Sequence, residues 1–135
     1  MNKIKLNKFK MVNYAVGDFL IKVKNASMAG NKVVVVAANK GNLAIAEALK
    51  KFGYFDEVKK EKETLTISLA FRNKRPLLIN LKLVSKPGLR IYLGVDEIAE
   101  KKGPSIFLIS SPKGIISSKE AIKQRMGGEV IAEIW

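Results

Sequence analysis

Residues 106–117, with the sequence IFLISSPKGIIS, join a run of apolar residues to a loop of small and polar ones. The apolar run 106–109 has the length and composition of a short buried strand. The loop 110–114 that follows it offers hydroxyl groups, a lysine and a glycine. Glycine lets a backbone approach a ligand closely, and the hydroxyl and ammonium groups can donate hydrogen bonds to it. The stretch therefore predicts a strand that carries a binding loop.

Turn signals before this stretch indicate a small, mainly β lobe that begins near residue 84. Residues 86–88, Lys-Pro-Gly, form a tight turn, and apolar residues alternate beyond it up to Leu93. A short helix is expected over 95–102, where Gly103-Pro104 ends it.

Further signals complete this lobe after the binding loop. Ser118 is expected to cap a helix that runs to Arg125, because its hydroxyl can accept from a free N–H of the first turn. Gly127-Gly128 ends that helix, and residues 129–135 alternate as a last strand. We therefore expect a C-terminal lobe over 84–135.

The N-terminal half predicts a second lobe of helices and strands over 13–83. Apolar residues at helical spacing from Val12 to about Ala26 indicate an amphipathic helix. Residues 33–36, all valine, indicate a buried strand, and a second helix is expected after 39–42. Gly53 stands where a glycine commonly ends a helix.

Two alternating segments, 65–71 and 77–83, are expected to pair as an antiparallel hairpin that covers both helices. The lysine-rich residues 1–12 are interpreted as a flexible basic arm. The predicted fold class is therefore α+β, with two small lobes.

The composition favours a polyanionic partner and argues against an enzyme. The 135 residues carry a formal net charge of +13, beyond the magnitude of roughly 2 to 8 that keeps a small domain soluble. The chain has no cysteine and no histidine, so the usual thiolate nucleophile, general base and zinc ligands are absent. No secretory signal or membrane-spanning run is found, and we expect a cytoplasmic protein without cofactor or metal.

Three loops of the second lobe, 85–90, 110–114 and 127–129, combine glycine with hydroxyl or cationic residues. This combination suits the wide and shallow minor groove of an RNA helix, which displays 2′-hydroxyls. Lys86, Arg90 and Lys113 would meet the flanking phosphates. A purely structural role is the ordinary reading of each loop taken singly, because glycine and proline often mark turns. Tyr92 could equally stack on a base or serve as a half-exposed structural residue.

The same segments resemble the family of small-subunit ribosomal protein eight. The matching stretches are 84–92 (VSKPGLRIY), 109–117 (ISSPKGIIS) and 127–131 (GGEVI), with 17–20 (GDFL) and 22–26 (KVKNA) in the first helix. Their order and spacing agree with the family from about Asn13 to Trp135. The resemblance implies a two-lobed, non-enzymatic constituent of the small ribosomal subunit. It would bind the central domain of small-subunit rRNA as a primary binding protein and stabilise its folding during ribosome assembly.

The resemblance also implies how the chain meets RNA. The loop 110–114 would enter a minor-groove face of an rRNA helix, and Glu129 would tie the loops together rather than contact phosphate. The first helix and the turn at 39–40 would touch RNA backbone on a second surface. The expected RNA-binding residues are Ser85, Lys86, Pro87, Gly88, Arg90, Tyr92, Ser110, Ser111, Pro112, Lys113, Gly114, Gly127, Gly128, Glu129, Lys22, Lys24, Asn25, Asn39 and Lys40.

Two positions of the signature loop depart from the family. Ser111 replaces a threonine, which keeps the hydroxyl and loses a methyl group. Pro112 replaces a serine and can donate no hydrogen bond. The lysine-rich start exceeds the usual family start.

By resemblance we expect a monomer within the particle that contacts neighbouring ribosomal proteins. Its own messenger RNA is a further candidate partner, which it would bind as a translational regulator. Two other classes remain open from the residues. One is a non-ribosomal architectural protein that binds RNA or DNA, in which the helix 118–125 with its cations would be the reader. The other is an enzyme that acts on a small anionic substrate through Lys and carboxylates, although the sequence pairs no nucleophile with a base.

Overall fold

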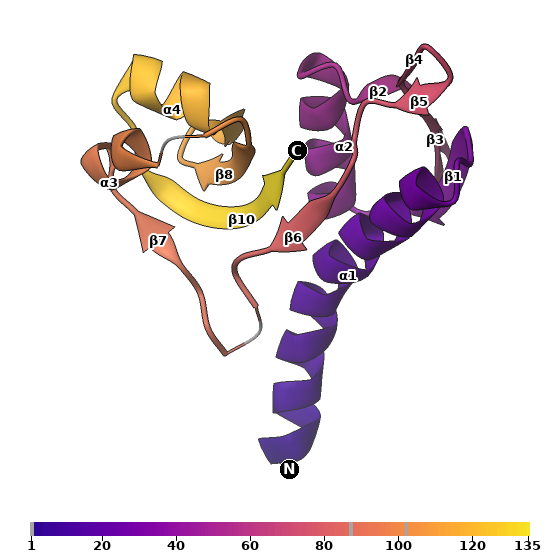
Figure 1. The fold of residues 1–135 in the computed structure, drawn as a ribbon. Coiled ribbons are helices and arrows are strands. Elements are labelled where there is room, and N and C mark those ends of the chain that lie inside the picture. Colours follow the sequence, from indigo (N-terminus) through magenta and orange to yellow (C-terminus); the bar gives the residue numbers. More distant parts are fainter. Residues whose placement is uncertain (1, 87, 102) are drawn as a thin grey trace.

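The computed structural model describes residues 2–86, 88–101 and 103–135, and side chains from residue 15 onward. Two parts lie side by side, each with its own sheet (Figure 1). The elements of the first are α1 (Asn2–Met28), β1 (Val33–Ala37), α2 (Lys40–Lys51), β2 (Phe55–Glu61), β3 (Thr64–Leu69), β4 (Phe71–Arg72) and β5 (Arg75–Pro76). Those of the second are β6 (Leu81–Leu83), β7 (Tyr92–Leu93), α3 (Val95–Glu100), β8 (Ile106–Ser111), β9 (Gly114–Ser117), α4 (Ser118–Gln124) and β10 (Gly128–Ile134). The predicted α+β class is confirmed.

The first sheet has the order β1-β3-β2, with antiparallel pairs, and α1 and α2 pack on it. Alternate residues of the central strand β3, Leu65 and Ile67, are fully buried because every second side chain of a strand faces the same side. They contact Leu20 of α1 and Leu49 of α2 within one apolar cluster. Burying a side chain of this size contributes about 1.5–3 kcal/mol.

Helix α2 has the boundaries that its capping residues specify. The Asn39 side chain accepts a hydrogen bond from the Asn42 N–H at 2.8 Å at the start. Gly53 follows the last turn with a φ of +96°, a left-handed conformation that glycine adopts without strain. The predicted glycine stop is therefore confirmed.

One expectation about strand pairing in the first lobe is wrong. The segment 65–71 does not form a hairpin with 77–83: β3 pairs with β1 and β2, whereas β6 pairs with β10. Residues 55–61, for which no strand was expected, form β2 at one edge of the sheet. Alternation identifies a strand in the sequence, but it carries no information about the partner of that strand.

Strand β1 is also more exposed than its four valines indicated. It lies at an edge of the sheet, where only Val36 is buried, while Val33 and Val35 are about half exposed. Uninterrupted valines are typical of strands covered on both faces. Here the helices cover only one face.

Helix α1 begins at Asn2, earlier than the expected start near Val12. The sequence has no glycine or proline before Gly17, and lysine is a good helix former, so nothing in it interrupts a helix there. Residues 2–12, expected to be a flexible arm, therefore continue the helix. Whether this basic segment contacts RNA stays a prediction.

The second sheet has the order β6-β10-β8-β9, with β7 also paired to β10. Its buried residues Leu108, Ala132 and Ile134 belong to the same apolar cluster as α1 and α2. Ile98 of α3 and Ala121 of α4 cover a smaller cluster on this sheet. The two lobes thus share one continuous core, which fixes the second sheet against the first helices.

The cap of α4 is one residue earlier than predicted. The Ser117 hydroxyl accepts the Glu120 N–H at 3.2 Å, whereas the Ser118 hydroxyl accepts the Phe107 N–H on β8. Adjacent serines are equivalent in a sequence pattern, and the tertiary contact with β8 separates their roles.

In the part of the chain described here, no helix has the length and apolar character needed to cross a membrane.

Candidate nucleic-acid interface

The loop 110–114 is the tip of the β8–β9 hairpin. Ser111 pairs with Gly114 across this tip, which leaves Pro112 and Lys113 exposed in the turn. The Ser111 hydroxyl donates to the Gly114 carbonyl at 2.8 Å and accepts from the Lys113 N–H at 3.2 Å. Its hydrogen is therefore used inside the turn, and Oγ can offer a ligand only its remaining acceptor site. Ser110 is half-buried at the end of β8.

A second exposed turn lies between β6 and β7. The N–H groups and carbonyls of Lys86 and Leu89 bond to each other at 2.9 Å in both directions. Gly88 has a φ of +84°, which the turn requires and which favours glycine. Lys86, Leu89 and Tyr92 are exposed here, so the cation can meet a phosphate and the ring can meet a base. Pro87 lies outside the described residues.

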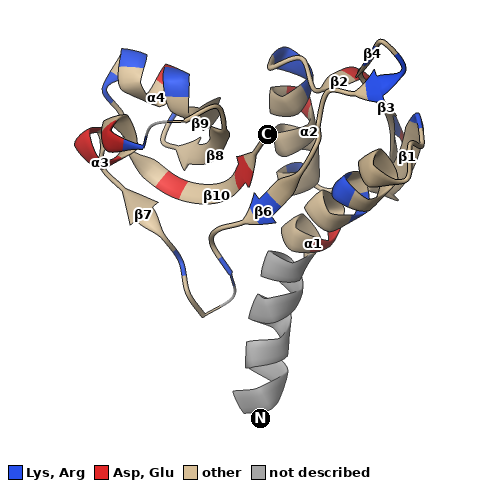
Figure 2. Cartoon of the chain, viewed as in Figure 1, with Lys and Arg blue, Asp and Glu red and all other residues tan. Residues whose placement is uncertain are grey.

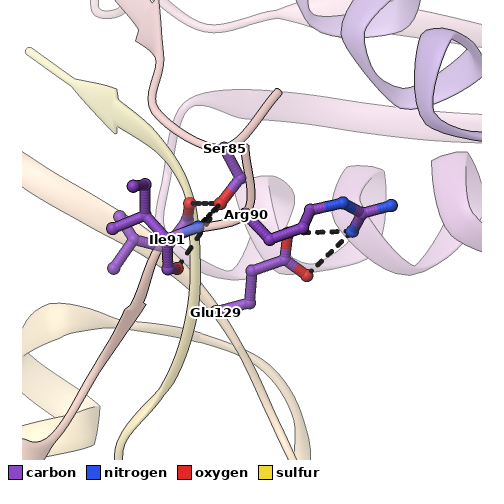
Figure 3. A network of polar contacts seen from close by, with 5 residues as sticks. Ser85, Arg90, Ile91 and Glu129 are labelled. Carbon is purple, nitrogen blue, oxygen red and sulfur yellow. Dashed lines mark hydrogen bonds and ion pairs between the residues drawn. The ribbon is translucent and has the colours of Figure 1, made fainter. Parts of the chain in front are cut away.

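Ser85 connects this turn to β10. Its hydroxyl donates to the Val130 carbonyl at 2.7 Å and accepts from the Ile91 N–H at 2.9 Å (Figure 3). These bonds cross 45 and 6 residues of sequence. The hydroxyl hydrogen and one acceptor site are thus used within the protein, and these bonds hold the turn against β10.

Arg90 and Glu129 form the charged part of the same network (Figure 3). The Arg90 Nη1 lies 2.9 Å from one Glu129 carboxylate oxygen and 3.2 Å from the other. The backbone of Glu129 pairs with Tyr92 on one side and with Ser110 on the other, so this residue stands where the three loops meet. In the described residues, Nη2 and Nε of Arg90 donate no hydrogen bond, which leaves them available to a phosphate.

Gly127 and Gly128 allow the close approach of the backbones. A Cβ on Gly127 would lie 2.3 Å from the Leu93 carbonyl oxygen, and one on Gly128 would lie 2.2 Å from the Ser110 carbonyl oxygen. Both distances are far below a van der Waals contact, so only glycine fits without displacing β7 and β8. The two glycines therefore bring the loops together, and the sequence alone had suggested a ligand as the reason for them.

A groove of about 650 Å³ lies between the lobes, beside these loops. Helices α1 and α2 line one side with mainly apolar residues and Asp18, and the other side carries Arg90, Ser110 and Glu129. No pattern in the sequence indicated this groove, because its walls come from segments that are distant along the chain.

The expected second surface lies on the first lobe. Lys22 and Asn25 are exposed and follow Asp18 and Ile21 at helical spacing, so they share the side of α1 that borders the groove. Lys24 is half-buried. Asn39 caps α2 with its side chain, and Lys40 is exposed beside it.

Charge is unevenly distributed over the second lobe (Figure 2). Helix α3 carries the exposed acids Asp96, Glu97 and Glu100, and the neighbouring α4 carries Lys119 and Lys123.

No group of three or more acidic side chains among the described residues lies close enough together to hold a metal ion. Burial raises the pKa of Tyr54 above its usual value, and this tyrosine packs against the core of the first lobe.

The fold and the loop cluster define a class: a basic, two-lobed α+β protein whose exposed turns carry cations and hydroxyl groups. Residues 15–135 match the family described as Ribosomal protein S8. The small ribosomal subunit protein uS8 of Spiroplasma kunkelii is 39% identical over 124 residues, covering 89% of this chain and 96% of that protein.

Other relatives with the same description agree. That of Roseiflexus castenholzii is 37% identical and covers 92% of this chain and 98% of that protein. That of Persephonella marina is 38% identical and covers 93% of this chain and 100% of that protein. The chain belongs to the ribosomal protein S8 family.

Proposed function

We propose that this chain is a structural constituent of the small ribosomal subunit that binds the central domain of the rRNA and stabilises its folding during assembly. The family is a structural one, so the chain is not an enzyme. The observation that carries the proposal is the joining of the loops 85–90, 110–114 and 127–129 by Ser85, Glu129 and the paired glycines. Such a cluster presents its turns to RNA in a fixed arrangement, so little ordering remains to be done on binding.

The expected RNA contacts divide by exposure. Exposed groups such as Lys86, Lys113 and the outer nitrogens of Arg90 would neutralise phosphates. The turn at Ser111 and Gly114 would lie against 2′-hydroxyls, because its backbone is exposed and little side chain stands in the way. This surface is supported by residues that hold the three loops to one another, namely Ser85, Gly127, Gly128 and Glu129.

The test is binding to a central-domain fragment of small-subunit rRNA, compared with an unrelated structured RNA of equal length at several salt concentrations. A site-specific binder keeps a preference for the first RNA as salt rises, because base and sugar contacts do not depend on counterion release. Equal affinities that vanish together with rising salt would show that charge alone drives binding, and the proposal would be wrong.

Ser111→Ala sharpens this test within the loop. Loss of the hydroxyl unties the turn and removes an acceptor from the interface, so we expect affinity for the specific RNA to fall by about 1–3 kcal/mol. Ser68→Ala on β3 in the other lobe is the matched control and should leave the affinity unchanged. An unchanged affinity for Ser111→Ala would show that this turn does not enter the groove.

Lys113→Ala separates phosphate contact from specific recognition. We expect weaker binding to both RNAs alike and a salt slope that is shallower by about one. Lys59→Ala on β2 provides a control with the same change of charge. Weaker binding to the central-domain fragment alone would instead indicate that Lys113 contacts a base.

A regulatory role would use the same surface. We propose that a segment of the chain's own messenger RNA with the shape of the rRNA site competes for these loops, and a competition assay with the two RNAs tests it. The reading of duplex DNA by α4 is disfavoured, since this helix has only seven residues, ends at a left-handed Arg125 and buries Ala121.

A further inference from the structure

The two edges of the first sheet differ sharply in their chemistry. Strand β2 reads FDEVKKE, with five charged residues and a register shift between Phe55 and Glu57. Strand β1 reads VVVVA, without a charge, a proline or a bulge. Charges and bulges on an edge strand prevent it from pairing with another chain. The protein thus protects one edge of this sheet and leaves the other open.

The backbone of β1 has bonding groups that point outward. The Leu69 N–H donates to the Lys32 carbonyl, and the Ala38 N–H donates to the Glu63 carbonyl, both at 2.8 Å. In an antiparallel pair these bonds alternate along the strand. The backbone N–H and C=O groups of even-numbered residues of β1 therefore point toward β3, and those of odd-numbered residues point away from the sheet. The Asn42 side-chain amide donates a hydrogen bond to the outward Ala37 carbonyl at 3.0 Å. The outward N–H and C=O groups of Val33 and Val35 have no hydrogen-bond partner among the described residues.

The side chains at the same positions are exposed and apolar. Val33 and Val35 are 52% and 54% exposed and point to one face, since they are two residues apart in a strand. Their register partners on β3 are Ser68 and Thr66, so the valines border hydroxyl-bearing residues rather than charges. An exposed β-branched row beside unpaired backbone is the arrangement to which an extended peptide adds as a strand.

Charge indicates the kind of segment that fits. The exposed Lys32 directly precedes β1, whose own residues Val33–Ala37 carry no charge. A second copy of the chain, itself at +13, would bring like charges together. RNA would gain nothing from the valines, which offer no hydrogen bond. The complement is a polypeptide with apolar residues at alternate positions and an acidic flank.

We propose that the β1 edge binds such an extended segment of a neighbouring small-subunit protein, which adds as a fourth strand beside Val33 and Val35. The proposal rests on assembly of the chain into the small subunit, as proposed above, but on none of the RNA-binding loops. It assigns the open edge of the first lobe to protein and the turns of the second lobe to RNA.

The experiment uses assembled small subunits that carry a photoreactive benzoylphenylalanine in place of Val33. We expect a cross-link to one neighbouring protein, within a segment that has alternating apolar residues and an acidic flank. A cross-link to rRNA, to a second copy of the chain or to nothing would overturn the proposal.

Two variants in this background test the geometry. Val35→Lys should lower the cross-link yield at least fivefold, whereas Glu57→Gln on β2, with the same change in net charge, should leave it unchanged. Val35→Pro removes only an outward N–H and should give the same loss without an added charge. An equal yield for all variants would contradict strand addition.

The free proteins provide the folding control. Val35→Lys alters an exposed side chain, so we expect its melting temperature and its affinity for the central-domain RNA to match the unaltered chain. Failure of RNA binding in the unaltered chain would count against the proposed function alone, and a lost cross-link with intact RNA binding would count against the strand addition alone.

Discussion

The two lobes reach their shapes by different means. In the first lobe, the helices and β3 are specified by periodic apolar residues and by local caps such as Asn39 and Gly53. In the second, short strands and turns are held by bonds between distant residues, of which the contact of Ser85 with Val130 is an example. The first lobe therefore depends chiefly on buried apolar area, whereas the second adds close backbone contacts and a few polar groups to its share of the core.

This difference bears on function. In a binding loop, polar residues and glycines are expected to face the ligand. In the second lobe, several of them instead hold the loops to one another. Under the proposed function, recognition is then left to the exposed turns and cations. Substitutions in the two lobes should consequently damage different properties, and three of them test this in order of decreasing effect.

Leu20→Ala should cause the largest loss, because this fully buried side chain of α1 lies in the core that both lobes share. We expect the free energy of unfolding to fall by about 2–5 kcal/mol. Chemical denaturation followed by hydrogen exchange in both sheets provides the measurement. Loss of protection in the first sheet alone would show that the lobes unfold independently, against the shared core.

Gly128→Ala should follow, with a loss of about 1–3 kcal/mol or more, because its Cβ would collide with the Ser110 carbonyl. RNA affinity should fall with it, since β8 and its hairpin must move. Gly17→Ala is the matched control: its Cβ would meet only the Leu83 side chain at 3.5 Å, in the interior of α1. There the exchange should stabilise the chain by roughly 0.5–1 kcal/mol. Equal melting temperatures for both variants would remove the steric argument.

Ser85→Ala should have a smaller effect, at the lower end of about 1–3 kcal/mol, because it leaves the Ile91 N–H and the Val130 carbonyl without their partner at a half-buried site that water can reach. Thermal unfolding measures the loss. If Ser85 supports the loops as described, destabilisation accompanies any loss of RNA affinity. Weaker RNA binding at unchanged stability would show instead that its hydroxyl contacts RNA.

Much of the fold could be predicted because local signals are sufficient for it. The helical spacing around Leu20, the glycine after α2 and the alternation of 129–135 each indicate one element, and the structure has all three. The strand partners could not be predicted. Leu81 pairs with Ile134, 53 residues further on, and no pattern within β6 specifies that choice.

The candidate site divides in the same way. The sequence identified the three loops and their cations, because glycine, proline and serine mark turns and lysine marks charge. It did not reveal that Ser85, Gly127 and Gly128 contact other parts of the chain, and their contact with RNA stays a prediction.

By itself, the sequence determined the fold class, the basic charge, the absence of cysteine and histidine, and the positions of the exposed turns. Those are properties of composition and short-range order. Only the tertiary structure decided which loops meet, which edge of the first sheet stays open and where the groove between the lobes lies. The physical reason is that hydrogen-bond partners and van der Waals limits between distant backbones exist only after the chain has folded.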